Sequence, residues 1–385
     1  MVAVIDSLEQ GGAERSLVDG IEALEAEGVR VDIVTLREGG FFSDAAESAG
    51  ARVTELRATG RREAAALLTR WLRERRPDLL HTTLFDSNVA GRVAAARLRI
   101  PVVTSLVNTP YGPDHRAEPG VTTAGVLAAQ SLDAVTARVV RRFHANSHEV
   151  ARVMSRRLAI RPSKIEVIPR GRDPRRLGTR SAERRQRVRD QLEVEPGSFV
   201  IVAAARHEPN KGLDVLLAAV SSLPADLRAR ASVAVAGRDG RATATLHSHA
   251  AELSASGGVD VRWLGVRDDV ADLLAAADVF VSPSRREGFP GVIVEALALE
   301  APIVATAVGG TLEALGSGCG VVVPIGDPRS LSEALESVAA HPAEAAQRAA
   351  AGRRRFEARF TTAAVAAETA AFYRRALGRG DLWGD

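Results

Sequence analysis

Two glutamates in the stretch REGFPGVIVEAL, residues 286–297, have seven residues between them across a loop-to-helix junction. Glu287 precedes the turn Gly288-Phe289-Pro290-Gly291, and Glu295 lies about one turn into the apolar segment that starts near Val292. Backbone N–H groups at such a helix start lack intrahelical partners, so they suit an oxygen-rich ligand. A carboxylate repels phosphate but accepts hydrogen bonds from hydroxyl groups. We therefore expect the two glutamates to bind two sets of sugar hydroxyls, although Glu295 could also serve only as a helix-dipole partner.

Two cations lie five positions apart in RHEPNKG, residues 206–212, directly after the apolar run SFVIVAAA. Arg206 offers a planar fork of donors and Lys211 a flexible point charge, a combination that suits a diphosphate. The alternative is two solvated loop residues. Lys211 is one of only two lysines among 51 basic residues, which favours a specific role.

Two further turns are weaker candidates. GGAER, residues 11–15, places Gly11 and Gly12 at a helix start where backbone N–H groups could approach an anion, although a plain tight turn is equally compatible. The Val266–Arg267 turn follows the run VDVRWLG and could contact a flat base through its backbone. Asp268 or Asp269 is expected to cap the helix that comes next.

Short apolar runs alternate with helical periodicity along the chain, which predicts βαβ units and parallel sheets. One helical segment covers 14–27 and another covers 343–378, whereas the Arg-rich segment 170–190 is expected to be a linker that runs into a helix. The predicted strands are 1–5, 31–36, 51–56, 78–82, 101–107, 142–147, 164–169, 198–205, 231–237, 259–265, 278–284, 301–308 and 320–325.

The predicted fold class is α/β, with two Rossmann-like doubly wound parallel-sheet domains that face a central cleft. We place the N-terminal, acceptor-binding domain at 1–172 and the C-terminal, donor-binding domain at 173–362. A final helix at about 363–385 is expected to pack back on the first domain. Ligands of such sheets bind beyond the carboxyl ends of the strands, where the motifs above lie.

Composition narrows the function classes. The 385 residues are 46% hydrophobic and 26% charged, enough for two cores. Cys319 is the single cysteine, which fits a reducing cytoplasm. No apolar run of about 18 residues occurs, and the first residues do not resemble a signal peptide. The formal charge of +3 and the 4% aromatic content argue against nucleic acid as a partner, and the abundance of arginine fits a GC-rich genome.

The segment E-G-F-P-G-V-I-V-E resembles the E-x7-E signature of the retaining family-4 glycosyltransferases of GT-B fold. Arg206, Lys211 and Gly212 are similar to the diphosphate clamp of that family, and GGAER to its N-terminal glycine loop. Three further segments resemble family motifs in the same order: ANSHEV (145–150), KIEVIPRG (164–171) and VGGTLEAL (308–315). The resemblance extends from about residue 5 to residue 340.

The resemblance implies a nucleotide diphosphate sugar as co-substrate and a role for each motif. Arg206 and Lys211 would hold the diphosphate with the backbone of Gly12, Glu295 the ribose, and Glu287 the donor sugar. The backbone N–H groups of Phe289 and Gly291 would lie near the donor, and the Val266–Arg267 turn near the base. The reaction would be a front-face transfer to a hydroxyl acceptor, either a glycan, a glycolipid or a small metabolite. No DxD-like motif follows a strand, so we expect no cofactor and no required metal.

The acceptor side departs from the family pattern. The family often has a histidine where this chain has Val107-Asn108, its H-x-H segment is His81-Thr82-Thr83 here, and its N-G turn is Arg170-Gly171. Candidate acceptor-binding residues, each of which could equally be a turn residue, are Asp86, Asn88, Asn108, Tyr111 and His115.

The basic segment 58–78 carries Leu67, Leu68, Trp71 and Leu72 on one side. It would either rest on anionic lipid or cover the sheet as an ordinary helix. We expect a cytoplasmic protein with a possible peripheral contact at the inner face of the membrane. Two alternatives to the transferase stay open: a non-catalytic paralogue that binds a nucleotide sugar, and another GT-B enzyme such as a nucleotide-sugar epimerase.

Overall fold

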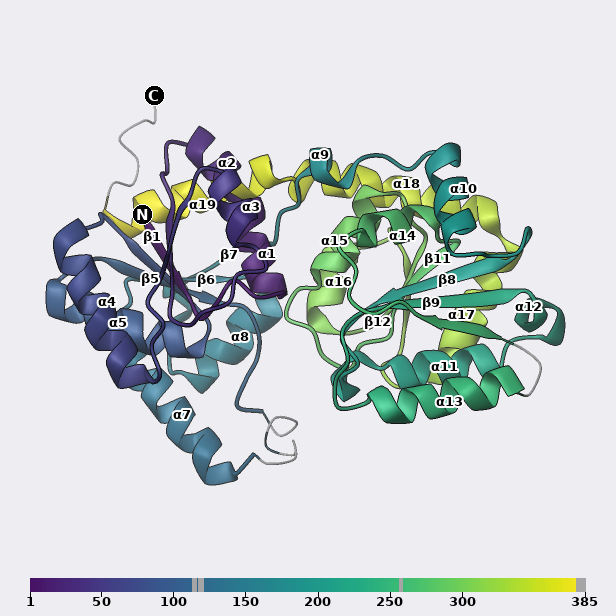
Figure 1. Cartoon of the computed structure of the whole chain (residues 1–385), viewed down its shortest axis with the longest axis horizontal. Helices are drawn as coiled ribbons and strands as arrows, with labels where there is room; N and C mark the ends of the chain where they lie inside the picture. The colour runs from purple at the N-terminus through teal and green to yellow at the C-terminus, as the bar shows by residue number, and fades with distance from the viewer. Residues whose placement is uncertain (113–115, 117–120, 256–258, 379–385) are drawn as a thin grey trace. The chain divides into compact units, whose positions relative to one another are not determined.

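The computed structural model describes residues 1–112, 116, 121–255 and 259–378 (Figure 1). The chain divides into two compact units, which are described one at a time. Unit 1 comprises Met1–Asp173 and Thr361–Asp385, and unit 2 comprises Pro174–Phe360. Each unit has one parallel sheet with helices on both faces (Figure 1).

The sheet of unit 1 has seven parallel strands in the order β3-β2-β1-β4-β5-β6-β7. Side chains alternate between the two faces of a strand, so Val2 and Val4 enter one core while Ala3 and Ile5 enter the other. The strands are β1 (Val2–Ile5), β2 (Asp32–Thr35), β3 (Arg52–Glu55), β4 (Leu80–Thr83), β5 (Val102–Leu106), β6 (Arg142–Ala145) and β7 (Ile165–Val167). All seven match predicted runs.

The helical segment expected over 14–27 is two helices rather than one. Gly20 separates them, and its N–H donates to the carbonyl of Leu17 instead of continuing the α-helical pattern. Glycine favours such a break because it has a low helix propensity. The helices before Pro174 are α1 (Gly12–Asp19), α2 (Ile21–Ala26), α3 (Ser43–Ser48), α4 (Arg61–Arg75), α5 (Phe85–Leu98), α7 (Thr123–Thr136), η1 (Ala137–Val139), α8 (His148–Arg157) and η2 (Pro162–Lys164).

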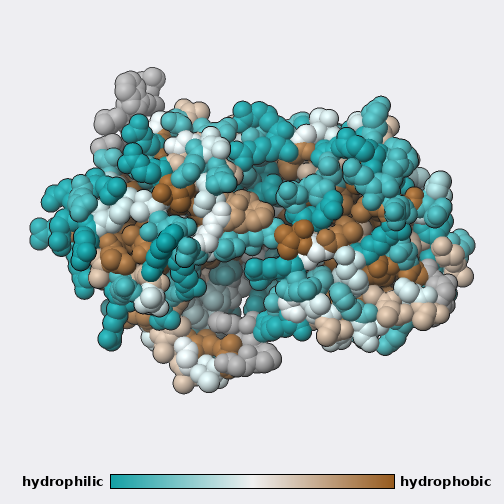
Figure 2. All heavy atoms as spheres, viewed as in Figure 1, coloured by the Kyte–Doolittle hydropathy of each residue, from teal (hydrophilic) through white to brown (hydrophobic). Residues whose placement is uncertain are grey.

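Helix α4 is the basic segment that could have rested on lipid. Leu68 and Leu72 are fully buried in the core of unit 1, and Trp71 is half-buried against the same core. The apolar side of α4 therefore covers the sheet, and only the arginine side faces solvent. Within the described part of the chain, no helix combines the length and apolar character that crossing a bilayer requires. On the face seen in Figure 2, hydrophilic residues dominate and apolar ones form small separate patches.

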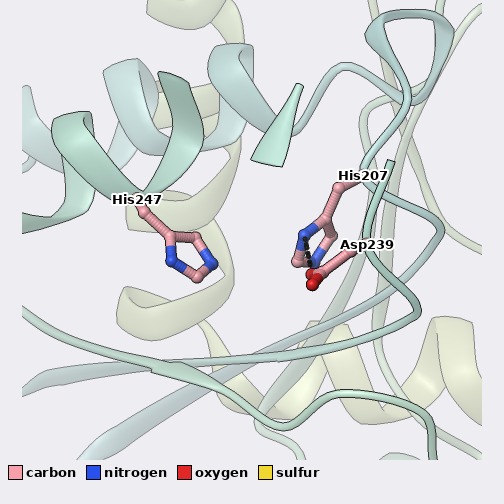
Figure 3. Close-up of side chains that lie close together, drawn as sticks. All are labelled: His207, Asp239 and His247. Carbon is pink, nitrogen blue, oxygen red and sulfur yellow. Dashed lines mark ion pairs between the residues drawn. The ribbon is translucent and has the colours of Figure 1, made fainter. Parts of the chain in front are cut away.

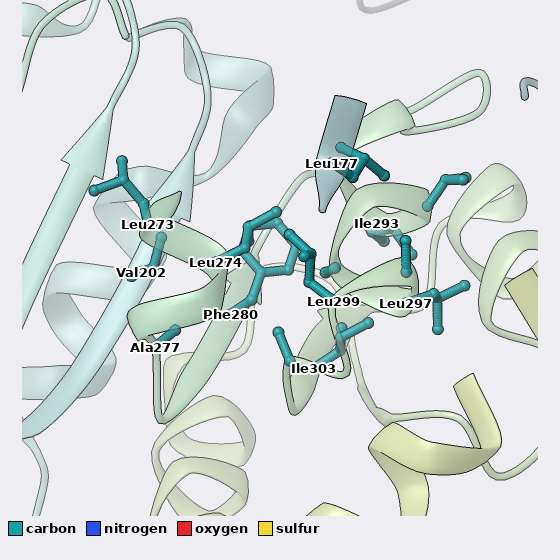
Figure 4. Packing of buried hydrophobic residues seen from close by; sticks show 14 of the residues in the cluster. Leu177, Val202, Leu273, Leu274, Ala277, Phe280, Ile293, Leu297, Leu299 and Ile303 are labelled. Carbon is teal, nitrogen blue, oxygen red and sulfur yellow. The ribbon is translucent and has the colours of Figure 1, made fainter. Parts of the chain in front are cut away.

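The sheet of unit 2 has six parallel strands in the order β10-β9-β8-β11-β12-β13. One of its two cores packs Phe280 and Ile303 from the sheet against Leu274 and Ile293 from the helices (Figure 4). The strands are β8 (Phe199–Ala204), β9 (Ala231–Ala236), β10 (Asp260–Trp263), β11 (Val279–Ser282), β12 (Ile303–Thr306) and β13 (Val321–Val323). These also match the predicted runs.

The helices of unit 2 begin with two short ones, α9 and α10, in the segment expected to be a linker that runs into a helix. They are α9 (Pro174–Leu177), α10 (Ala182–Gln191), η3 (Pro209–Lys211), α11 (Leu213–Ser221), α12 (Ala225–Ala229), α13 (Thr243–Ala255), α14 (Val270–Ala276), α15 (Gly291–Ala298), α16 (Gly309–Leu315), α17 (Pro328–Ala340) and α18 (Pro342–Arg359). Asp269 occupies the N-cap position of α14, but its side chain makes no capping hydrogen bond, so the expected cap is wrong. The carboxylate instead binds Arg267 through two donors.

The C-terminal helical segment also breaks, and the break coincides with the return of the chain to unit 1. Helix α18 belongs to unit 2, and α19 (Thr362–Ala376) belongs to unit 1 and packs on α2. The Thr361 side chain caps α19 by accepting a hydrogen bond from the Ala364 N–H. The Thr362 N–H donates to the carbonyl of Arg172 at 3.0 Å, which ties the start of α19 to the end of the first segment of unit 1.

Candidate functional site

The closest contact between predicted site residues joins Lys211 to Glu287. Nζ of Lys211 lies 2.6 Å from Oε1 of Glu287, and both side chains are more than four-fifths buried. The Ser284 hydroxyl donates to the same oxygen at 2.8 Å. Glu287 is thus fixed at the carboxyl end of β11 with Oε2 left for other donors. An ammonium carries three protons, so Lys211 can bind an anion while it holds the glutamate.

A second set of bonds holds the two loops that carry this pair. The Arg285 N–H donates to the carbonyl of Asn210 at 2.8 Å, and its guanidinium forms a bidentate pair with Asp214 at 2.7 and 2.6 Å. The same guanidinium donates to the carbonyl of Pro209. The loop after β8 and the loop after β11 are therefore joined along their length, which fixes Lys211 opposite Glu287.

Two glycines allow backbones to approach closely around the site. Gly212 has φ +67°, and a Cβ there would lie 2.0 Å from the carbonyl oxygen of Pro283. A Cβ on Gly310, at the start of α16, would lie 2.0 Å from the carbonyl oxygen of Gly288. Gly212 of the KG motif and Gly310 of VGGTLEAL are therefore required by the packing of one loop against another.

The turn that follows Glu287 leads directly into α15. Pro290 is its N-cap residue and Gly291 its first helical residue, one position before the expected start at Val292. Phe289 is buried in the core, with its ring 5.8 Å from that of Phe360 in an edge-to-face arrangement. Only backbone groups of this turn are therefore offered to a ligand. Glu295, in the second turn of α15, is 6% exposed.

The other predicted donor-site residues of unit 2 are more exposed. Arg206 is exposed immediately after β8. Val266 is half-exposed, and Gly265 before it has φ +62° and accepts a backbone hydrogen bond from Gly237 at 2.7 Å. The guanidinium of Arg267 is taken up by Asp269, and that contact raises the pKa of Arg267.

The glycine loop of unit 1 begins α1. Gly11 is the N-cap residue and Gly12 the first helical residue, and a Cβ on Gly12 would lie 2.3 Å from Nη1 of Arg170. A guanidinium thus lies beside the predicted anion-binding loop. Burial raises the pKa of Glu14, and hydrogen bonds from its own N–H group and the charge of Arg170 oppose that rise.

The predicted acceptor residues of unit 1 do not form one cluster of available side chains. Asp86 is bound by Arg37 and by Arg61, the latter at 2.7 Å. Asn88 is buried, and its Oδ1 has no hydrogen-bond partner among the described residues. Asn108 is exposed. His115 lies outside the described residues.

Tyr111 has a clear structural role. It is buried, has φ +70°, and its hydroxyl donates to Oδ2 of Asp133 at 2.8 Å. Oδ1 of Asp133 accepts from Nη1 of the fully buried Arg92 at 2.6 Å. Burial raises the pKa of Tyr111 and lowers that of Arg92. Tyr111 therefore anchors its loop to a buried ion pair.

His81, at the family's H-x-H position, and His144 are linked by hydrogen bonds through the Ser105 hydroxyl. His81 lies 2.7 Å from both the Tyr373 hydroxyl of α19 and the Ser105 hydroxyl, which in turn is 3.0 Å from His144. Burial, with a smaller effect of His144, lowers the pKa of His81 to about 3. A cavity of about 110 Å³ adjoins these residues, and Val107 and Arg170 also line it.

The ANSHEV segment, quoted above for its resemblance, organises the neighbouring loop. Nδ2 of Asn146 donates to the carbonyl of Val107 at 2.9 Å, where the family often has its histidine. Ser147 caps α8 by accepting from the Val150 N–H. Asn146 thus supports the loop that follows β5, and Ser147 the start of α8.

The arrangement of two parallel sheets is the GT-B fold. HepE of Anabaena in complex with UDP-glucose aligns with a TM-score of 0.83 at 23% identity, covering 97% of this chain and 99% of that one. WaaG, a glycosyltransferase involved in lipopolysaccharide biosynthesis, aligns with a TM-score of 0.75 at 18% identity, covering 97% and 99%. These likenesses show that the chain has the GT-B fold.

Family models match both units: Glycosyltransferase Family 4 over residues 10–176 and Glycosyl transferases group 1 over residues 184–355. The D-inositol 3-phosphate glycosyltransferase of Kineococcus radiotolerans is 31% identical over 79% of this chain and 73% of its own. That of Streptomyces bingchenggensis is 30% identical over 78% and 67%. The chain belongs to glycosyltransferase family 4, and it transfers a sugar from a nucleotide sugar.

Some residues that shape the site were not found from the sequence. Ser284, Arg285 and Asp214 carry no catalytic pattern. Ser284 contacts Glu287 three positions away, whereas Arg285 contacts Asp214, 71 positions away. A usable signal existed for Ser284 and Arg285, because Ser284 is the last residue of a predicted strand and Arg285 directly follows it. The Tyr111–Asp133–Arg92 contacts had no such signal.

Proposed function

We propose that this chain is a retaining glycosyltransferase whose unit 2 binds a nucleotide diphosphate sugar between the loop after β8 and the loop after β11. The observation that carries this proposal is the contact of Lys211 with Glu287 at 2.6 Å. It puts a phosphate-binding cation beside a hydroxyl-binding carboxylate, as a sugar attached to a diphosphate requires.

Each group has a distinct task in the proposed reaction. Arg206 and Lys211 stabilise the negative charge that grows on the leaving diphosphate as the bond from the anomeric carbon to phosphate oxygen breaks. Glu287 accepts hydrogen bonds from donor-sugar hydroxyls and so orients the anomeric carbon. The acceptor oxygen forms the new bond on the same face, and its proton passes to the leaving phosphate oxygen.

The proposal assigns the remaining donor contacts to the other motifs. Glu295 would accept from the ribose hydroxyls, and the backbone of the turn Gly288-Phe289-Pro290-Gly291 would bind the donor with Val292. The backbone of Val266 and Arg267 would contact the base. In unit 1, the loop of Gly11 and Gly12 would bind an anion through its backbone N–H groups.

We base the proposed acceptor on the names of the curated relatives, and the proposed base of the donor nucleotide on the ligand of HepE. The curated relatives are named D-inositol 3-phosphate glycosyltransferases, so we propose a hydroxyl of a phosphorylated polyol as the first acceptor to test. HepE was solved with UDP-glucose, so UDP-sugars head the donor panel. In unit 1 the exposed Asn108 is the best-placed of the predicted acceptor residues, and Arg170 offers a cation at the cavity described above.

The test compares site variants with a matched surface variant. We expect Lys211→Ala and Glu287→Ala each to lower transfer more than about tenfold while the fold is kept, because each removes a contact to the reacting parts of the donor. Arg329→Ala is the control, since it removes an exposed ion pair with Glu333 in α17. Far-ultraviolet circular dichroism checks folding.

Near-wild-type transfer in both site variants would refute the site. Melting-point shifts with a panel of nucleotide sugars report binding separately from turnover. A shift without transfer to any acceptor would instead support the non-catalytic paralogue. Turnover in chelator tests metal dependence: a complete loss that Mn²⁺ or Mg²⁺ restores would overturn the expectation that no metal is required.

A further inference from the structure

Three side chains with metal-binding atoms meet in unit 2. His207 follows β8, Asp239 follows β9 and His247 belongs to α13. One ligand atom from each lies within 4.8 Å of the other two. Figure 3 shows the ring of His247 directed toward the His207–Asp239 pair.

The backbone fixes the position of His207 relative to the loop of Asp239. The His207 N–H donates to the carbonyl of Arg238 at 3.0 Å, and the His207 carbonyl accepts from Ala242 at 2.9 Å. Nδ1 of His207 lies 3.4 Å from Oδ1 of Asp239. The two residues are thus held together by main-chain bonds, whatever their side chains bind.

Helix α13 provides the third potential ligand, His247, on the helix face that points toward His207. Thr243 and His247 are four residues apart, so both point toward His207 from successive turns. Oγ1 of Thr243 lies 3.2 Å from Nδ1 of His207. The ring of Trp263 stacks on His247 at 4.7 Å and meets His207 edge-on at 4.9 Å. Trp263 therefore forms an apolar wall beside both imidazoles.

The burial of the three groups differs in a way that suits ligand binding. His207 is 1% exposed, and its Nε2 is buried without a hydrogen-bond partner among the described residues. An imidazole coordinates a metal through a ring nitrogen that carries no proton. Asp239 and His247 are exposed and can rotate.

We propose that His207, Asp239 and His247 form a binding site for a borderline transition-metal ion, with Zn²⁺ as the best match. Two imidazoles and a carboxylate are a ligand set that Zn²⁺, Co²⁺ and Ni²⁺ take, whereas Mg²⁺ and Ca²⁺ prefer oxygen ligands throughout. Zn²⁺ bonds of about 2.0–2.2 Å bring ligand atoms to roughly 3.5 Å from one another. On binding, the exposed side chains of Asp239 and His247 would therefore move closer to His207 by about 1 Å.

None of the three proposed metal ligands is among the residues proposed for sugar transfer, which are Arg206, Lys211 and Glu287. Arg206 directly precedes His207, so an ion at the site would restrain the loop that carries Arg206. The ion would thus order a donor loop without contacting the donor.

The experiment uses the full-length chain without a histidine tag, stripped with chelator and titrated with Zn²⁺ in a calorimeter. We expect one ion per chain with a Kd below about 50 μM. His247→Ala and Asp239→Ala should each weaken binding at least about tenfold, because each removes one of three ligands. His249→Ala is the matched control, since His249 is exposed on the same helix two residues along and is expected to leave the Kd unchanged.

Absorption of the Co²⁺ form gives a second measure, because tetrahedral coordination produces an intense visible band that the His247→Ala variant should lose. Equal Zn²⁺ affinity in wild type and His247→Ala would overturn the proposal. A wild-type Kd above 50 μM would overturn it too. Since Asp239 and His247 are exposed, neither variant is expected to impair folding.

Discussion

Units 1 and 2 share one architecture but use their polar residues differently. In unit 1, polar side chains beyond the strands bind one another: Tyr111 binds Asp133, and His81 binds Tyr373 and Ser105. In unit 2, the corresponding groups are partly exposed, as Lys211, Glu287 and Arg206 are. The polar groups of unit 1 thus fix loops and α19, whereas Arg206 and the Lys211–Glu287 pair of unit 2 stay accessible to the ligand proposed above.

Two arginine–aspartate pairs sharpen this contrast. Arg92 and Asp133 form a pair in unit 1 with almost no exposure, and burial lowers the pKa of Arg92. Arg285 and Asp214 form a bidentate pair in unit 2 that is about 40% exposed, and their contact raises the pKa of Arg285 and lowers that of Asp214. Water screens the second pair and not the first, so the two should differ in what their loss costs.

The largest expected effect is that of Asp133→Asn. The substitution leaves the buried charge of Arg92 without its carboxylate, which is expected to cost about 3–5 kcal/mol of the free energy of unfolding of unit 1. The chain has three tryptophans, of which Trp71 lies in unit 1. Urea unfolding followed by Trp71 fluorescence, with Trp263 and Trp383 replaced by Phe, measures that loss. A change below about 1 kcal/mol would show that the pair does not stabilise unit 1.

Acidification should weaken unit 1 through His81. Its pKa is about 3 in the folded chain and about 6.5 unfolded, so the unfolded state takes up a proton first as pH falls. The stabilisation is complete above pH 6.5 and is lost progressively toward pH 3, by about 2 kcal/mol between pH 7 and pH 5. The Trp71 fluorescence measures it at both pH values.

His81→Asn is the control for the pH effect. It removes the titrating ring, so the loss of unfolding free energy between pH 7 and pH 5 should shrink relative to wild type. An equal loss in both proteins would assign the acid sensitivity to other groups.

The smallest expected effect is that of Arg285→Ala. The Arg285–Asp214 pair is exposed, so its removal should cost less than about 1 kcal/mol of the free energy of unfolding of unit 2. Fluorescence of Trp263, with Trp71 and Trp383 replaced by Phe, reports on that unit. A loss above 2 kcal/mol would mean that the contrast between the two pairs is not one of exposure.

Most of the fold could be predicted because buried parallel strands are continuous apolar runs. Twelve of the thirteen strands lie within predicted runs, and β4 ends at Thr83, one residue past its run. Helix ends were predicted less well. Gly20 and Thr361 break segments whose periodicity continues past them, and a capping bond or a change of unit decides such breaks. Asp269 shows the same point, because Arg267 competes for the carboxylate that could have capped α14.

The candidate site was predictable where a motif is local. The KG and EGFPG segments follow strands, so the sequence predicts that their side chains lie close together at one edge of the sheet of unit 2. The same rule predicts the acceptor candidates, but it does not predict that the Tyr111 hydroxyl donates to Asp133, 22 positions away.

The sequence by itself determined the class of fold, the family and the charges beyond the strands, because apolar runs and local motifs are encoded in neighbouring residues. Only the tertiary structure decided which of these charges remain available. Glu287 remains beside Lys211, 76 positions away, because the Arg285–Asp214 pair and the close approach of Gly212 to Pro283 join their loops. His207, Asp239 and His247 meet because three elements converge at one end of a sheet, and nothing in their spacing foretells it.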